Sequence, residues 1–212
     1  RLFGVASESV ALNNLGFDDI HSLKPGQMAV VTDGKLRFEQ FATRKKLARC
    51  FFEWVYFSNV ASTIDGQNVY VTRAESGRKL AEMEDQAMDE SCVVVPVPDT
   101  AKAAADAFAY AMGIPSIEGL IRNRYIGRTF IQPTSTRGRS ARGKYTPLPA
   151  VLRGRRVFLV EDSIVRSTTL RELTERIRHH GEAKEIHVRV ACPPIVSPCF
   201  YGIDMSTLRE LF

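Results

Sequence analysis

The apolar and polar positions of the chain fall into two regions with different periodicities. In the first region, two short apolar runs flank Asp33-Gly34, a dipeptide that favours the tight turn of a β-hairpin. The pattern predicts a hairpin over residues 27–38. Residues 1–48 are therefore expected to be rich in β-structure.

After Tyr56 the pattern alternates between helical spacing and short apolar runs. Helical spacing predicts helices over residues 76–89, 100–112 and 168–180, and the last two are followed by Gly113 and Gly181, which favour helix ends. Apolar runs predict strands over residues 92–97, 156–160 and 185–191. Such alternation is typical of an α/β fold in which helices flank a parallel sheet.

Two of the predicted strands end in polar turns, at residues 96–100 and 161–169. In an open α/β sheet, ligands bind where strands pass into helices. Amides of a turn that enters a helix favour an anion, and Ser167, Thr168 and Thr169 add hydroxyl donors. The carboxylates of Glu161 and Asp162 would repel a phosphate but suit sugar hydroxyls or Mg²⁺. A ribose 5-phosphate combines both requirements.

Two alternatives compete with this interpretation. Glu161 and Asp162 could be a helix N-cap and its exposed neighbour, but the preceding strand and the following hydroxyl-rich turn are not explained by capping. Residues 138–144 also match the spacing of a phosphate-binding P-loop. Tyr145 stands where that motif needs Ser or Thr, and Pro147 and Pro149 disfavour the helix that should follow.

Composition limits the class of protein. The 212 residues are 44% hydrophobic and 25% charged, as in an ordinary globular protein. No apolar run reaches the roughly 20 residues of a membrane span, and no signal peptide is apparent, so we expect a cytoplasmic location. Because the chain opens on Arg1 and stops inside a predicted helix, we expect a fragment of a longer protein.

The net charge of +5 is unevenly distributed. Residues 119–160 contain ten cations and no Asp or Glu. A block of this kind attracts polyanions, and nucleic acid is one candidate. Its position next to the Glu161-Asp162 turn favours a small phosphorylated ligand instead.

Several segments of the chain resemble those of a known family. The segment from Val160 to Thr169, VEDSIVRSTT, resembles the phosphoribosyl-pyrophosphate (PRPP) motif of type I phosphoribosyltransferases, and in detail that of the glutamine PRPP amidotransferases. Further segments resemble parts peculiar to that family: residues 52–57, 123–133 and 198–204. Residues 6–9 and 24–26 are similar to the end of its Ntn-type glutaminase domain. The resemblance implies two domains, residues 1–48 and 49–212.

The resemblance also implies roles for individual residues. The 5-phosphate would be held by the segment that comprises Ser163, Ile164, Val165, Arg166, Ser167, Thr168 and Thr169. Glu161 and Asp162 would meet the ribose hydroxyls and, with Thr100, Mg²⁺. Asp99 and Thr100 would form the pyrophosphate loop. Arg128 and the basic segment up to Lys144 would be a flexible catalytic loop that closes over PRPP, with Lys144 nearest the leaving group and the ten cations neutralising pyrophosphate.

The implied reaction is the first committed step of purine synthesis, in which PRPP, glutamine or ammonia, and water give 5-phosphoribosylamine, pyrophosphate and glutamate. Purine nucleotides would act as feedback inhibitors, and a homo-oligomer without nucleic-acid or membrane partners is expected. Two positions depart from the family motif, which usually has Asp at Glu161 and Gly at Ser167. The glutaminase nucleophile, an N-terminal Cys, has no counterpart before Cys50.

The four cysteines form no CxxC pair, so core thiols or metal ligands are favoured over disulfides. Some members of the family carry a [4Fe-4S] cluster, and Cys50 and Cys199 stand at two of its ligand positions. Cys92 and Cys192 do not match, so the remaining two ligands would lie outside this chain. The alternative is that both are buried thiols.

Two rival functions remain open from the sequence. One is a salvage phosphoribosyltransferase that joins a base to PRPP, and the other is a nucleic-acid-binding regulator with the same fold. Neither needs the glutaminase-like residues 1–48. For the PRPP site itself, we expect the pair Glu161 and Asp162 to lie at a solvent-facing strand end.

Overall fold

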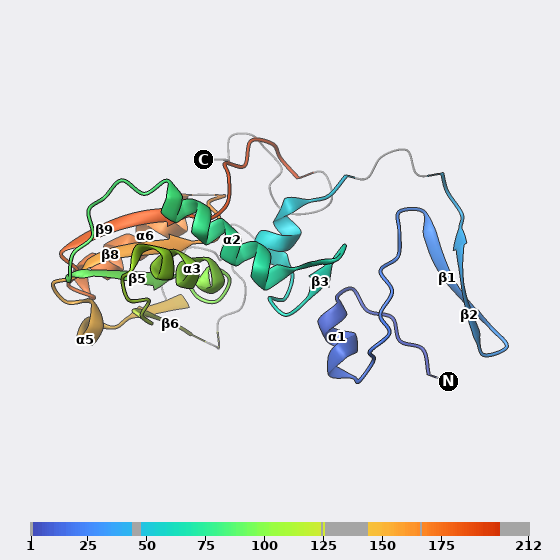
Figure 1. Cartoon of the computed structure of the whole chain (residues 1–212). Coiled ribbons are helices and arrows are strands. Elements are labelled where there is room, and N and C mark those ends of the chain that lie inside the picture. The colour runs from blue at the N-terminus through green and yellow to red at the C-terminus, as the bar shows by residue number, and fades with distance from the viewer. Residues whose placement is uncertain (1, 44–47, 124, 126–143, 166, 200–212) are drawn as a thin grey trace. The chain divides into compact units, whose positions relative to one another are not determined.

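The computed structural model describes residues 2–43, 48–123, 125, 144–165 and 167–199 (Figure 1). The chain divides into two compact units, Arg1–Thr72 and Arg73–Phe212. The domain boundary expected after residue 48 stays a prediction.

The first unit contains the predicted hairpin. Strands β1 (Gln27–Thr32) and β2 (Lys35–Gln40) pair antiparallel around Asp33 and Gly34, which have φ angles of 50° and 69°. Two consecutive positive φ angles are those of the hairpin turn that Asp-Gly favours, so this prediction is confirmed. Short elements that the pattern did not predict accompany the hairpin: helix α1 (Ser9–Asn14), the π-helical turn η1 (Glu53–Phe57) and the paired strands β3 (Thr63–Ile64) and β4 (Gln67–Asn68).

The second unit is built on a parallel sheet. Strands β5 (Cys92–Pro96), β8 (Arg156–Glu161) and β9 (Glu185–Val190) lie in the order β5-β8-β9. The register places Val94 beside Phe158 and Phe158 beside His187. All three strands were predicted from their apolar runs, and the expected α/β fold is confirmed.

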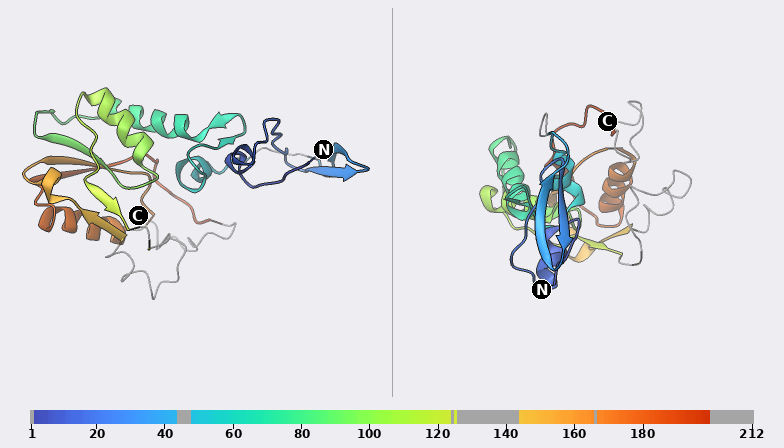
Figure 2. Two further views of the ribbon diagram at one scale, coloured as in Figure 1. Left: turned by 90° about the horizontal axis from the view of Figure 1, so that it is seen from below. Right: turned by 90° about the vertical axis from the view of Figure 1, so that its right-hand side faces the viewer.

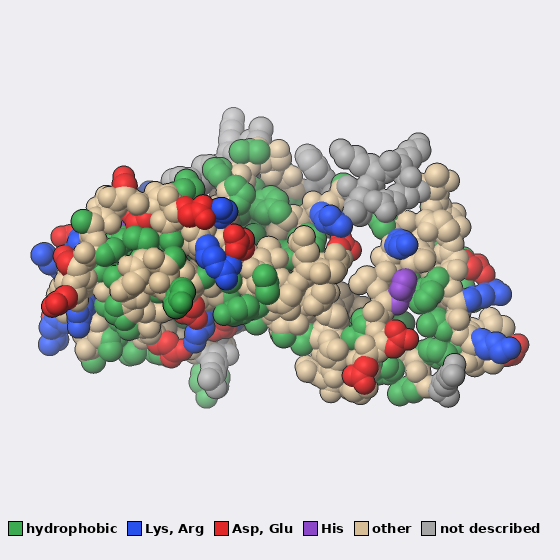
Figure 3. Space-filling view, in the orientation of Figure 1, with side chains coloured by type: hydrophobic (Ala, Val, Ile, Leu, Met, Phe, Trp, Pro, Cys, Tyr) green, Lys and Arg blue, Asp and Glu red, His purple; other side chains and the backbone are tan. Residues whose placement is uncertain are grey.

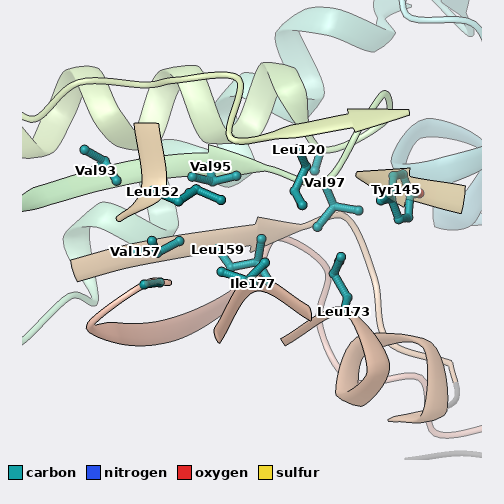
Figure 4. Close-up of a cluster of buried hydrophobic side chains, with 12 residues drawn as sticks. Val93, Val95, Val97, Leu120, Tyr145, Leu152, Val157, Leu159, Leu173 and Ile177 are labelled. Atoms are coloured by element: carbon teal, nitrogen blue, oxygen red, sulfur yellow. The ribbon is translucent and has the colours of Figure 1, made fainter. Parts of the chain in front are cut away.

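Helices cover both faces of this sheet. Figure 2 shows α2 (Val69–Glu82) and α3 (Lys102–Met112) on one face and α6 (Ser167–His179) on the other. Alternate residues of β5 and β8 enter the two cores. Val93, Val95, Val157 and Leu159 point toward α6, where they pack with Leu173 and Ile177 (Figure 4). The opposite face packs against α3 and α2 through Cys92, Val94, Phe108, Ala109, Phe158, Val160, Leu80 and Ala81.

One predicted helix is displaced. The pattern placed it at residues 76–89, whereas α2 begins at Val69 and ends at Glu82. The Asn68 side chain accepts a hydrogen bond from the backbone N–H of Val71 at 3.2 Å, which caps the helix earlier than the apolar spacing indicated. By contrast, α3 ends as predicted, since Gly113 has a φ angle of 68° and closes the helix.

A second, antiparallel pair lies beside the face that α6 covers. It consists of β6 (Leu120–Arg122) and β7 (Tyr145–Pro147), and the one-turn helix α5 (Pro149–Leu152) follows β7. Leu120, Tyr145 and Leu152 are buried in the same core as Leu173 and Ile177. The pair therefore fixes both ends of the segment between Arg122 and Tyr145. No helix of the described residues is long and apolar enough to cross a membrane.

Candidate active site

The two polar turns meet at the carboxyl edge of the parallel sheet. Because β5 and β8 are neighbours, the backbone N–H of Val97 donates to the carbonyl of Val160 at 2.8 Å, just before both strands end. The chain then turns through Pro98-Asp99, whose peptide bond is cis, on one side. On the other side it turns through Asp162. The predicted pyrophosphate loop and the predicted ribose site are thus adjacent.

Asp162 connects these two turns. Its carboxylate accepts one hydrogen bond from the Thr100 hydroxyl and another from the Ser163 hydroxyl at 2.6 Å. Its backbone N–H donates to the Glu161 carboxylate at 3.0 Å. Asp162 is only 5% exposed, so the expectation that this carboxylate faces solvent is wrong. Two carboxylate oxygens offer about four lone-pair sites, which leaves acceptor capacity for ligand hydroxyls.

Burial and mutual repulsion act on both carboxylates. Desolvation and the neighbouring Asp162 charge raise the pKa of Glu161 well above its ordinary value. Desolvation also raises the pKa of Asp162, against the hydrogen bonds from Ser163 and Thr100 and the cations of Arg73 and Lys144. A site that holds two carboxylates this close is suited to a ligand with hydroxyl donors or a metal ion.

The predicted phosphate-binding segment follows directly after Asp162. Ser163, Ile164 and Val165 form the turn after β8, and α6 begins at Ser167. Val165 is 7% exposed, so its side chain anchors the turn in the core. Ser167, Thr168 and Thr169 contribute the first turn of α6, where backbone N–H groups are unpaired and favour an anion. The expected phosphate residue Arg166 lies outside the described residues.

Several contacts hold the pyrophosphate loop. The Tyr145 hydroxyl donates to the carbonyl of Pro98 at 3.0 Å, and the Arg122 guanidinium pairs with the Asp99 carboxylate. Lys144 is half-buried, with Nζ 5.0 Å from the centroid of the Tyr145 ring. Its charge partly opposes the rise in the pKa of both site carboxylates, so Lys144 lies close enough to act on them. Arg128, the other expected catalytic residue, lies outside the described residues.

The expectation that all ten cations of residues 119–160 neutralise pyrophosphate is wrong for three of them. Arg153 pairs with Glu182, and Arg156 pairs with Asp89 and Glu185. Arg155 donates to a backbone carbonyl. Arg156 is the first residue of β8, so these cations lie at the opposite end of that strand, about 16 Å from the carboxylate pair at roughly 3.3 Å per residue.

Two residues of the site were missed by the sequence reasoning. Arg73, on α2, is 6% exposed and acts electrostatically on Asp162. The helix predicted from the sequence began at residue 76, after Arg73, so no pattern indicated that this residue acts on Asp162. Tyr145 was considered only as a mismatch to the P-loop motif. Its position directly after the basic segment could have indicated a residue that anchors the end of that segment in the core.

The donor set fits Mg²⁺ that arrives with a substrate. Carboxylate and hydroxyl oxygens of Glu161, Asp162 and Thr100 are the ligand types that Mg²⁺ takes in proteins. Among the described residues there is no group of three or more His, Cys, Asp or Glu side chains that could hold a metal. Mg²⁺ is commonly bound by one or two carboxylates plus substrate phosphates, and this arrangement matches that pattern.

The cysteines differ in exposure. Cys50 is exposed and Cys199 is partly exposed. Cys92 is fully buried and donates to Asp89, while burial and the Asp162 charge raise the pKa of Cys192 to about 11. A thiol with a raised pKa is a poor source of the thiolate that metals bind. Cys92 and Cys192, which the sequence excluded as cluster ligands, are both buried, as core thiols are.

Known proteins resemble this chain over nearly all of its length. Two relatives, from Archaeoglobus fulgidus and Methanothermobacter thermautotrophicus, are 45% and 46% identical to it over 208 residues. A third, from Bacillus subtilis, is 43% identical over 208 residues. These relatives are amidophosphoribosyltransferases. The matches cover 98% of this chain but only 43–45% of each relative, so the chain spans less than half of their length.

Solved structures agree with the sequence relatives. The chain superposes with a TM-score of 0.82 and 42% identity on the glutamine PRPP amidotransferase of Bacillus subtilis complexed with ADP and GMP, covering 97% of this chain and 44% of that one. An allosteric regulatory enzyme of purine biosynthesis gives the same score and identity. The phosphoribosyltransferase fold expected from the PRPP motif is therefore confirmed. No family model matches the chain.

Proposed function

We propose that this chain carries the PRPP site of an amidophosphoribosyltransferase, which makes 5-phosphoribosylamine for purine synthesis. The observation that carries the proposal is the junction of the two turns, where Thr100 of the pyrophosphate loop donates to Asp162 of the ribose site. Identity of 43–46% to amidophosphoribosyltransferases supports the same reaction. Residues 1–48 would then be the end of a glutaminase domain that supplies ammonia.

The geometry accounts for how PRPP would be held. Backbone amides of residues 163–169 would bind the 5-phosphate at the start of α6, and Glu161 and Asp162 would accept hydrogen bonds from the ribose hydroxyls. The Thr100 turn would hold the pyrophosphate group. Mg²⁺, bound by substrate phosphates and by Thr100, Glu161 and Asp162, would stabilise negative charge on the leaving group.

Ammonia would attack the anomeric carbon as the bond to pyrophosphate breaks. Positive character that develops on the ribose would be stabilised by the carboxylates of Glu161 and Asp162, and the departing pyrophosphate by Lys144 and Arg128. Tyr145 keeps the pyrophosphate loop in place through Pro98. The loop that was expected from the sequence to close over PRPP falls mainly on residues 126–143, which lie outside the described residues.

The test uses ammonia, so that it depends on the PRPP site alone. The full-length protein should form phosphoribosylamine from PRPP, Mg²⁺ and ammonia, and Asp162→Asn should lower kcat/KM for PRPP about 100-fold or more, because a ribose contact is lost. Glu182→Gln, which removes a carboxylate at an exposed ion pair with Arg153, is the matched control. Unchanged turnover in Asp162→Asn would refute the assignment. Use of a purine or pyrimidine base in place of ammonia would favour the salvage alternative.

The same family resemblance supports an iron–sulfur cluster bound in part by Cys50 and Cys199. A [4Fe-4S] cluster ordinarily needs four thiolates, and the other two would come from outside this chain. The full-length protein purified without oxygen should then be brown and contain about four iron atoms per chain. A colourless, iron-free and fully active protein would leave Cys50 and Cys199 as structural thiols.

Regulation and assembly are also part of the proposal. Because the Bacillus subtilis relative is complexed with ADP and GMP, we expect purine nucleotides to inhibit this protein as well. A homo-oligomer stays a prediction. Inhibition of the ammonia-dependent reaction by these nucleotides, measured at fixed PRPP, would test the first expectation.

A further inference from the structure

Two oppositely charged side chains are buried in the described part of the chain. Asp162 is 5% exposed and Arg73 is 6% exposed. Ionised side chains are rarely buried unless an opposite charge or hydrogen bonds compensate the lost hydration.

The packing of α2 on α3 brings Arg73 toward the site. At Gly77 the two helices approach so closely that an added Cβ would lie 2.0 Å from the carbonyl oxygen of Ala104. Arg73 precedes Gly77 by four residues and so lies on the same face of α2. Thr100, which donates to Asp162, precedes Ala104 by the same spacing. Four residues before the contact, α2 and the turn that leads into α3 thus each carry a residue that acts on Asp162.

The charges around Asp162 come from every element packed against it. Glu161 adds a second carboxylate, Lys144 and Arg73 add cations, Thr100 and Ser163 donate hydroxyl protons, and the buried thiol of Cys192 lies nearby. Burial raises the pKa of Asp162, and the cation of Arg73 partly opposes that rise, as a nearby guanidinium should. Arg73 lies on α2, a helix of 14 residues.

We propose that Arg73 is a positioning residue for PRPP: its buried guanidinium balances the charge of Asp162 and holds that carboxylate where the ribose hydroxyls would meet it. The role rests on the proposed function of the site. Arg73 acts through Asp162, so its loss should weaken PRPP binding more than it slows turnover at saturation.

The experiment compares Arg73→Met with Arg73→Lys in the full-length protein. Arg73→Met removes the charge at nearly constant length, and we expect KM for PRPP in the ammonia reaction to rise about 10-fold or more, with kcat changed less. Equilibrium binding of PRPP with Mg²⁺, without ammonia or glutamine, should weaken in parallel. Arg73→Lys should stay within about 3-fold of the wild type because it restores the cation. Arg78→Met, an exposed arginine on the same helix, is the control.

A second readout does not depend on PRPP. In urea unfolding, Arg73→Met should raise the unfolding equilibrium constant about 100-fold, and adding Asp162→Asn should recover about 10-fold or more of that loss. If Arg73→Met does not fold, the double variant should fold. Additive effects, a double variant that fails like the single one, or equal defects in Arg73→Met and Arg73→Lys would overturn the proposal. A wild-type protein that does not bind PRPP would instead refute the proposed function.

Discussion

The ion pair between Glu84 and Arg189 offers a sharp test of how the sheet is held together. Glu84 follows α2, and its carboxylate accepts hydrogen bonds from the Arg189 guanidinium of β9 at 2.6 and 2.7 Å. The Glu84 side chain is 0% exposed, and that of Arg189 is 24% exposed. The Arg189 guanidinium also lies 5.5 Å from the ring centroid of Phe158. We predict that Arg189→Met destabilises the protein strongly.

The magnitude follows from these contacts. Removing one partner of a buried pair costs about 3–5 kcal/mol, because the remaining charge is left without compensation. Arg189 is partly exposed, so we place the loss for Arg189→Met at about 3 kcal/mol. Adding Glu84→Gln removes the stranded charge and should recover about 1 kcal/mol or more. Arg78→Met breaks an exposed pair with Glu75 and should cost less than about 0.5 kcal/mol.

The effect should depend on pH. In the wild type, the hydrogen bonds from Arg189 lower the pKa of Glu84 below its ordinary 4.5. Stability from this pair is therefore present above pH 4.5 and is lost as the pH falls through the lowered pKa of the folded state. Without Arg189, burial should raise the pKa of Glu84. Protonation of Glu84 at lower pH then removes its uncompensated charge, so the variant loses less stability there. The destabilisation should be larger at neutral pH than near pH 4.5.

Urea unfolding followed by circular dichroism measures these differences. The four proteins (wild type, Arg189→Met, Glu84→Gln and the double variant) should be compared at neutral pH and near pH 4.5, with Arg78→Met as control. A loss below about 1 kcal/mol for Arg189→Met, equal at both pH values, would refute the reasoning.

Two further substitutions probe the packing beside the site. Gly77→Ala should destabilise the protein by about 1–3 kcal/mol in urea unfolding, because its Cβ would meet the Ala104 backbone; a gain of about 1 kcal/mol from helix propensity alone would contradict the close contact. Tyr145→Phe should cost about 1 kcal/mol and weaken PRPP binding, because it removes the hydrogen bond to Pro98. Tyr110→Phe, at a position 91% exposed, should change neither property, and an equal loss in the two variants would count against this role for Tyr145.

The parts of the fold that the sequence predicted are those specified by local signals. The apolar run from Cys92 needs no distant partner to be recognised as a strand, and Gly113 ends α3 because its own backbone adopts a positive φ angle. The PRPP motif likewise lies within one continuous turn, so Glu161 and Asp162 could be assigned together. The surface of α2 follows ordinary expectation too: Figure 3 shows acidic and basic side chains side by side over this helix, where Arg78 pairs with Glu75.

The parts that could not be predicted depend on contacts between distant segments. Asp162 was expected to face solvent, and it is buried because the Thr100 turn and Ser163 close around it. Arg73 carries no local sign of its role, since its effect on Asp162 arises only when α2 packs beside the sheet. Arg156 was expected to neutralise pyrophosphate because it belongs to the basic segment of the sequence. In the structure it is the first residue of β8 and so lies at the end of the strand opposite to Glu161.

The most direct test of the central claim is a crystal structure of the full-length protein with PRPP and Mg²⁺. Our account predicts the 5-phosphate against the backbone amides that lead into α6. It also predicts the ribose hydroxyls within hydrogen-bonding distance of the Glu161 and Asp162 carboxylates, and the pyrophosphate beside Thr100. PRPP bound elsewhere on the protein, with the carboxyl edge of β5 and β8 left empty, would contradict the account.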